Sequence, residues 1–235
     1  MNLQDMRWLL KDFAANSLLS QEIYRRFISS SGNFVNVDSD IVVEGYPRSG
    51  NTFFAALLMS HSLRPLKMAR HRHEIGQLKR AISLDKPIFL LVRNPLNSVA
   101  SFVIREGVSI SFALKYYMEF YGYVERSKES LNVICFSEMI DRPSKLIKLV
   151  QARVPNLPLT YYGTGSDMNV RSMIINMELE DSGGSEIRET HVGIPSKKRD
   201  YEKEIISNII ERKYKKIYME CRSIYERVYS KRYVL

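Results

Sequence analysis

One stretch of sequence decides the fold of this 235-residue chain: residues 41–53, which read IVVEGYPRSGNTF. The apolar, β-branched run at 41–43 is typical of a buried strand, and the apolar run at 53–59 is typical of a helix. Between them, Gly45 and Gly50 predict a tight turn. A strand, a glycine turn and a helix N-terminus together gather backbone N–H groups that can bind an anion.

The glycine turn has the spacing of a P-loop, and Thr52 stands where that motif has its hydroxyl residue. However, Asn51 occupies the position of the lysine that nucleotide triphosphatases use. The cation of this loop is instead Arg48, near its apex. This substitution argues against ordinary ATP chemistry.

The rest of the chain alternates strands and helices. Further buried strands are predicted within residues 86–95, where Asn94 and Pro95 end the strand, and at 132–136. Helices are predicted from Leu96 past Arg105, from Ser111 to Lys128, and from Pro143 onward. This alternation predicts an α/β fold in which a parallel sheet is flanked by helices on both faces. Ligands of such sheets bind at the carboxyl ends of the strands. Arg48 and Arg93 each follow a strand end, so we expect them to face the same crevice.

We expect a single domain over residues 1–235. Its expected parts are an N-terminal helical segment (1–32), a core (41–150), loops that are able to move (161–199) and a charged C-terminal helix (200–235).

Composition sets broad limits on the function. The net charge of +9 suits nucleic acid, an anionic membrane or a multiply phosphorylated small ligand. Cys135 and Cys221 lack metal-binding spacing and are expected to be free thiols, although a single disulfide stays open. Residues 1–31 carry charges throughout and predict neither a signal peptide nor a membrane span. The sequence therefore suggests a cytoplasmic protein, with a removed membrane anchor as the alternative.

The second candidate anion site begins at Arg93. A Mg²⁺-dependent P-loop phosphotransferase usually has an aspartate at the end of such a strand, to hold the water shell of the metal. No metal site is therefore predicted. Ser101 follows eight residues later, on the first turns of the next helix. A guanidinium fork and a hydroxyl can converge on one phosphate.

These two motifs resemble those of the cytosolic-type sulfotransferases. Residues 46–53 are similar to the phosphosulfate-binding loop of that family, commonly Tyr-Pro-Lys-Ser-Gly-Thr-Thr-Trp, and residues 93–101 to its second motif. The resemblance implies a P-loop NTPase-like sulfotransferase fold. It also implies transfer of a sulfuryl group from 3′-phosphoadenosine 5′-phosphosulfate (PAPS) to an acceptor hydroxyl, with adenosine 3′,5′-bisphosphate as the product.

The resemblance also implies roles for individual residues. Arg48 would stabilise the charge that builds on the bridging oxygen. The 3′-phosphate would be bound by Arg93 and Ser101, and the adenine would stack on Phe53. The 5′-phosphate would be bound by the Thr52 hydroxyl and by the backbone N–H groups of Ser49, Gly50, Asn51 and Thr52.

A further loop of the family closes over the 3′-phosphate and reads Arg-Lys-Gly-x-x-Gly. Arg188 and Gly193 fit its first and last positions, although the intervening Lys and Gly are absent. The alternative cations for this role are Lys197, Lys198 and Arg199.

The acceptor hydroxyl needs a base, and histidine is the usual one near neutral pH. In the family this base precedes the second-motif arginine by some 22 residues, which here indicates His71. His73 and Glu74 are alternatives. If the segment is extended, the rings of His71 and His73 point the same way.

Two other classes of function stay open. One is a P-loop nucleotide or small-molecule kinase, which would depend on Mg²⁺. The other is a non-catalytic protein that binds nucleotide or nucleic acid. We expect no nucleic-acid partner, because basic and aromatic residues interleave only at 212–216, on a predicted helix. The expected partner is a small-molecule or glycan acceptor.

Overall fold

The computed structural model of the protein describes residues 2–16, 33–127, 131–160, 167–181 and 197–233. Its four described strands form one parallel sheet with the order β2-β1-β3-β4. Their bounds are β1 Ile41–Gly45, β2 Met68–Arg70, β3 Ile88–Val92 and β4 Asn132–Cys135. The expected α/β architecture with a parallel sheet is confirmed.

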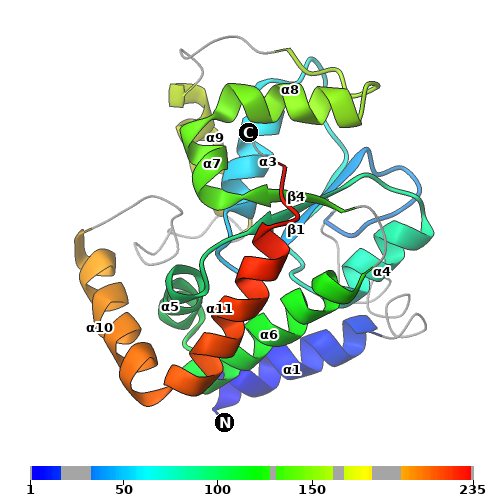
Figure 1. Ribbon diagram of the computed structural model, residues 1–235. Helices are drawn as coiled ribbons and strands as arrows, with labels where there is room; N and C mark the ends of the chain where they lie inside the picture. Colours follow the sequence, from blue (N-terminus) through cyan, green and yellow to red (C-terminus); the bar gives the residue numbers. More distant parts are fainter. Residues whose placement is uncertain (1, 17–32, 128–130, 161–166, 182–196, 234–235) are drawn as a thin grey trace.

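Helices cover both faces of this sheet (Figure 1). The helices of the described residues are α1 Leu3–Asn16, α3 Asn51–Ser60, α4 Ile75–Ser83, α5 Pro95–Glu106, α6 Ile110–Arg126, α7 Phe136–Asp141, α8 Pro143–Arg153, α9 Asp167–Asp181, α10 Lys197–Lys213 and α11 Lys215–Tyr229.

Two hydrophobic cores, one on each face, hold the layers together. Successive strand residues point to opposite faces, so Val42 and Leu90 enter one core while Val43 and Phe89 enter the other. The first core is completed by α4, α5, α6, α10 and α11, with Trp8 of α1 packed against it. The second is completed by α3, α7, α8 and α9. Both cysteines are free and buried, as the sequence predicted.

Two expectations about the second half of the chain are wrong. Residues 167–181 form the helix α9 rather than a loop, because Val170, Ile174 and Met177 recur at helical spacing and are buried against α3. The charged tail is two helices, α10 and α11, which meet at Tyr214.

The loop between β1 and α3 needs both of its glycines. A Cβ atom on Gly45 would lie 2.7 Å from the carbonyl oxygen of Leu91, where β1 passes close to β3. Gly50 has a φ of 100°, and a Cβ there would lie 2.6 Å from the ring of Phe136. The glycine spacing read from the sequence therefore reflects close packing as well as turn geometry.

Gly50→Ala should destabilise the protein more than Gly107→Ala does. Both glycines have positive φ, so each alanine incurs a conformational cost of about 1–2 kcal/mol. Only at Gly50 does the new Cβ also collide with packed side chains, since the nearest atom at Gly107 is 3.9 Å away. Urea unfolding of both variants measures the difference, and equal losses would contradict the tight packing under the loop.

Candidate active site

The candidate site lies at the carboxyl ends of three adjacent strands. The loop 46–50 follows β1, the residues His71 to Glu74 follow β2, and Arg93 follows β3. The guanidinium of Arg93 donates a hydrogen bond to the carbonyl oxygen of Arg48 at 2.8 Å. The two arginines therefore lie next to each other at one edge of the sheet.

Arg48 joins the two sequence motifs. It has a left-handed backbone, with φ of 67°, and its Nε donates to the hydroxyl of Ser101 at 3.1 Å. Arg93 stacks on the ring of Phe136, with its guanidinium carbon 4.0 Å from the ring centre. Ser101 therefore contacts the side chain of Arg48, and the guanidinium of Arg93 contacts the backbone of the loop.

The cations of this site repel one another. Burial first, and then the charges of Arg105, Arg199 and Arg93, lower the pKa of Arg48 to about 9. Burial and the charge of Arg199 likewise lower the pKa of Arg93 to about 10. Glu178 offsets part of this charge and pairs with Arg105 at 3.2 Å. A bound anion would relieve the repulsion that remains.

Helix α10 brings two further cations to this cluster. Arg199 is 4% exposed, and its charge acts on both Arg48 and Arg93. Burial, followed by the charges of Arg93 and Arg199, lowers the pKa of Lys203. Lys203 follows Arg199 by one helical turn. This spacing could have indicated from the sequence that the two cations lie together, but it was not recognised there. Arg188 lies outside the described residues, as do the side chains of Lys197 and Lys198.

The start of α3 offers backbone N–H groups to a ligand. Phe54 is the first residue of α3 whose N–H reaches a backbone carbonyl, that of Gly50, at 3.0 Å. In the described part of the chain, the N–H groups of Asn51, Thr52 and Phe53 therefore have no backbone acceptor. Ser49 differs from the expectation, because its N–H donates to Tyr46 and its hydroxyl contacts Tyr121.

The segment after β2 is not extended, contrary to the condition considered from the sequence. His71 and His73 have φ angles of 62° and 60°, which few residues other than glycine adopt. Their rings nevertheless lie side by side, with centroids 6.1 Å apart and planes inclined by 21°. We call the residues from His71 to His73 the histidine turn.

Hydrogen bonds give the two histidines different tautomers. The Nδ1 of His71 lies 2.7 Å from the guanidinium of Arg70, which can only donate, so the ring proton is on Nε2 and faces the Thr52 hydroxyl at 3.3 Å. The Nδ1 of His73 lies 2.8 Å from the carbonyl oxygen of Gly45, which can only accept. His73 therefore carries its proton on Nδ1 and has a lone pair on Nε2.

The surroundings keep His73 neutral. Its pKa lies well below the ordinary value, first because the ring is buried and then because the neighbouring His71 ring and the charge of Lys11 oppose its protonation. The side-chain nitrogen of Asn51 lies 3.1 Å from Nδ1 of His73, and a 180° rotation of this amide would bring its oxygen, an acceptor, to the protonated ring nitrogen. A neutral ring with a lone pair on Nε2 can accept a proton at neutral pH.

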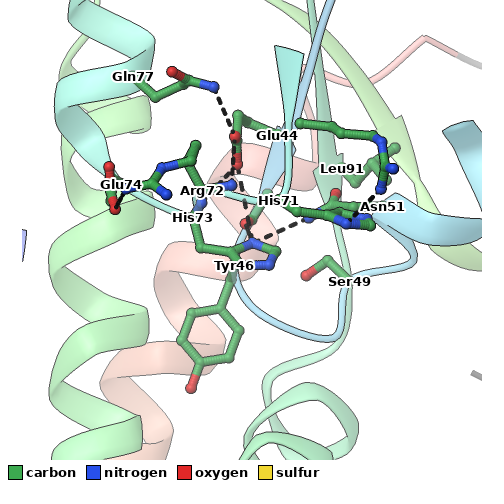
Figure 2. A network of polar contacts seen from close by, with 12 residues as sticks. Glu44, Tyr46, Ser49, Asn51, His71, Arg72, His73, Glu74, Gln77 and Leu91 are labelled. Atoms are coloured by element: carbon green, nitrogen blue, oxygen red, sulfur yellow. Dashed lines mark hydrogen bonds and ion pairs between the residues drawn. The ribbon is translucent and has the colours of Figure 1, made fainter. Parts of the chain in front are cut away.

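Glu44, which the sequence analysis did not single out, supports the histidine turn. Its carboxylate is fully buried and accepts the backbone N–H groups of Arg72 at 3.0 Å and His73 at 2.9 Å. Figure 2 shows it between this turn and the amide of Gln77, which is 3.4 Å away. Burial raises its pKa to about 7. The signal in the sequence was a lone charge inside an apolar strand.

Glu74, the third candidate base, is held on the other side of the turn. It accepts from the Arg72 guanidinium at 2.8 Å (Figure 2). It also lies 3.6 Å from Lys11 of α1. Three tyrosines of α6 fix the surrounding backbone, since Tyr116, Tyr117 and Tyr121 donate to the carbonyl oxygens of His73, Arg93 and Leu91.

Among the described residues, no group of three or more His, Cys, Asp or Glu side chains is placed to hold a metal ion.

No protein-family model matches the chain, and no curated protein sequence matches it either. In the described ranges, no helix is both long and apolar enough to span a membrane. What the site can do is therefore inferred from its own residues.

Glu44→Gln should change how stability depends on pH. The carboxyl loses its proton near pH 4.5 in the unfolded chain and near pH 7 in the folded one. Between these pH values the folded state therefore binds a proton that the unfolded state has lost. The contribution of Glu44 to stability therefore falls as pH rises through this window, by about 3 kcal/mol.

Urea unfolding of wild type and variant near pH 4 and near pH 8 measures this effect. The variant should gain stability relative to wild type as the pH rises. A difference between the two proteins that does not change with pH would show that Glu44 titrates normally.

Proposed function

We propose that this protein transfers a sulfuryl group from PAPS to an acceptor hydroxyl, in line and without a metal ion, on a P-loop NTPase-like sulfotransferase fold. The observation that carries the proposal is the meeting of the two motifs. Arg48 bonds to Ser101 at 3.1 Å, and Arg93 bonds to the backbone of Arg48 at 2.8 Å. Both halves of the expected donor site therefore converge on one loop.

The residues of the site fit a donor that carries anionic groups at two positions. Arg48 and the N–H groups at the start of α3 can bind one group. Arg93, Arg199 and Lys203, whose charges act on one another, can bind the second. PAPS has this pattern, with phosphates on its 3′ and 5′ positions, and when bound it supplies a sulfuryl group activated on the 5′-phosphate. Phe53 is half-buried beside this helix start and is proposed to contact the adenine.

Arg48 is proposed to stabilise the charge that develops on the departing phosphate. Its guanidinium is already oriented by Ser101, so little reorganisation is needed as the charge forms. With a pKa of about 9 in the free protein, which a bound anion would raise, Arg48 is charged at neutral pH and is proposed to act through its charge rather than by donating a proton.

His73 is proposed to remove the proton of the acceptor hydroxyl. The family spacing favours His71, but both ring nitrogens of His71 have hydrogen-bond partners, Arg70 and Thr52. His73 has its proton held on Nδ1 by Gly45 and can take the acceptor proton on Nε2. Thr52 is then proposed to contribute its backbone N–H to the phosphate while its hydroxyl orients His71.

Calorimetry with adenosine 3′,5′-bisphosphate, AMP and ATP, each with and without Mg²⁺, tests the donor site. We expect tight, metal-independent binding that requires the 3′-phosphate. Arg93→Ala should weaken it by about 2 kcal/mol, roughly 30-fold, because a charge-assisted contact is lost. Arg48→Ala should abolish turnover of PAPS and reduce binding much less.

Arg64→Ala is the matched control, since this arginine pairs with Asp40 at the surface, away from the site. It should bind like wild type. If the protein prefers ATP with Mg²⁺, the proposal is wrong and a kinase activity is favoured instead. If it binds none of the three nucleotides, the fold has no working donor site.

His73→Asn and His71→Asn should separate the roles of the two histidines. Asparagine tolerates positive φ, and its amide can donate to Gly45 as Nδ1 of His73 does. The wild-type rate should rise with pH through a pKa below the ordinary histidine value. His73→Asn should remove this rise and lower kcat on the order of 10²- to 10⁴-fold.

His71→Asn should keep the rise with pH. Profiles of kcat against pH show which histidine is the base. If only His71→Asn loses the rise of kcat with pH, the base is His71. Neither change should alter the affinity for adenosine 3′,5′-bisphosphate.

A further inference from the structure

A buried carboxylate in the first strand has no part in donor binding. Glu44 is fully buried in β1, beside Leu90 of β3, in a strand that is otherwise apolar except for its final glycine. A charge in such a place is costly unless hydrogen bonds compensate it. Its hydrogen bonds go to the residues that follow β2 rather than to the arginines that surround Arg48.

The bonds of Glu44 stabilise an unfavourable backbone. Pairing between β1 and β2 ends at Arg70, so the N–H groups of the next residues have no partner strand. Glu44 accepts two of them, those of Arg72 and His73, with one carboxylate oxygen each. The histidine turn can therefore keep its two left-handed residues without leaving these donors unbonded.

The same strand holds His73 at two points. Glu44 bonds its backbone N–H at 2.9 Å, and the next residue, Gly45, bonds its ring at 2.8 Å. Because these two bonds fix the backbone and one edge of the ring, they also fix the direction of Nε2. A shift of the backbone would break the bond between the ring and Gly45. The Nδ1–H tautomer would then no longer be favoured.

We infer that Glu44 is a positioning residue that holds the histidine turn so that His73 presents the lone pair of Nε2 to the acceptor hydroxyl. The catalytic half of this inference rests on the proposed function, whereas the half that concerns the turn does not.

The groups packed around Glu44 define what can change its charge. The His73 ring lies 3.9 Å away, and the Gln77 amide lies 3.4 Å away on α4. Lys11 of α1 favours the ionised carboxylate, and Glu74 opposes it. From α6, Tyr116 faces the same group, and the pKa of its hydroxyl is raised by burial first and in part by Glu44.

The test compares Glu44→Gln with the control Asp5→Asn. Glutamine keeps the size of the side chain but offers one acceptor instead of two to the turn. We expect kcat to fall roughly 10- to 100-fold, because the base is misplaced, with unchanged affinity for adenosine 3′,5′-bisphosphate and no loss of stability near pH 8. Asp5→Asn removes a buried carboxylate that accepts two backbone N–H groups elsewhere, those of Asn2 and Ser109, and it should keep kcat.

Nitrogen-15 NMR of the histidine rings tests the turn without turnover. In wild type, His73 should show the Nδ1–H tautomer and His71 the Nε2–H tautomer. In Glu44→Gln the His73 signals should move toward a mixture of the two, whereas Asp5→Asn should keep the wild-type pattern. Glu44→Asp, which keeps the charge on a shorter side chain, should fall between wild type and Glu44→Gln.

The outcomes separate the two proposals. Unchanged tautomers and an unchanged kcat in Glu44→Gln would overturn the positioning role, and so would an Nε2–H tautomer of His73 in wild type, whether or not any variant folds. If wild type neither binds adenosine 3′,5′-bisphosphate nor uses PAPS, the proposed function fails. The tautomer measurement would still decide whether Glu44 holds the turn.

Discussion

The candidate site depends on the missing side chain at Gly45. A Cβ atom there would lie 2.7 Å from the Leu91 carbonyl and 3.2 Å from the Asn51 amide, so any other residue would push apart β1, β3 and the start of α3. The same position lets the carbonyl of Gly45 meet the His73 ring at 2.8 Å. One glycine thus fixes the distance between the cationic loop and the histidine turn.

Charges of opposite sign are buried on the two sides of this glycine. Cations gather at the loop, where burial and mutual repulsion lower the pKa values of Arg48 and Arg93. On the other side, burial raises the pKa of Glu44, and its ionised form is kept by two backbone N–H groups. Both arrangements cost stability in the free protein, which is the usual sign that a site is organised for a ligand or a reaction.

The sequence was informative where local patterns determine the structure. Apolar runs predicted β1, β3 and β4, and the rule that parallel strands end at one edge placed Arg48 beside Arg93. It was uninformative where contacts are distant. Nothing local indicates that Glu44 bonds to His73, and the three residues of β2 are too few to show a period. In α9 the buried residues Val170, Ile174 and Met177 do recur at helical spacing, but the glycines on either side of them, at 163, 165, 183 and 184, favoured loops.

The position of Arg199 on α10 has a consequence for how the site comes into being. Chains are made from the N-terminus, and local units can fold as they emerge. The sheet and the glycine loop lie in the earlier part of the chain, but one wall of the cationic cluster arrives with α10, which packs on α5 and is followed by α11 on α6. During synthesis, the loop therefore exists as an open, weakly anion-attracting surface before the cationic cluster is complete. The docking of the late helices is the event that completes it.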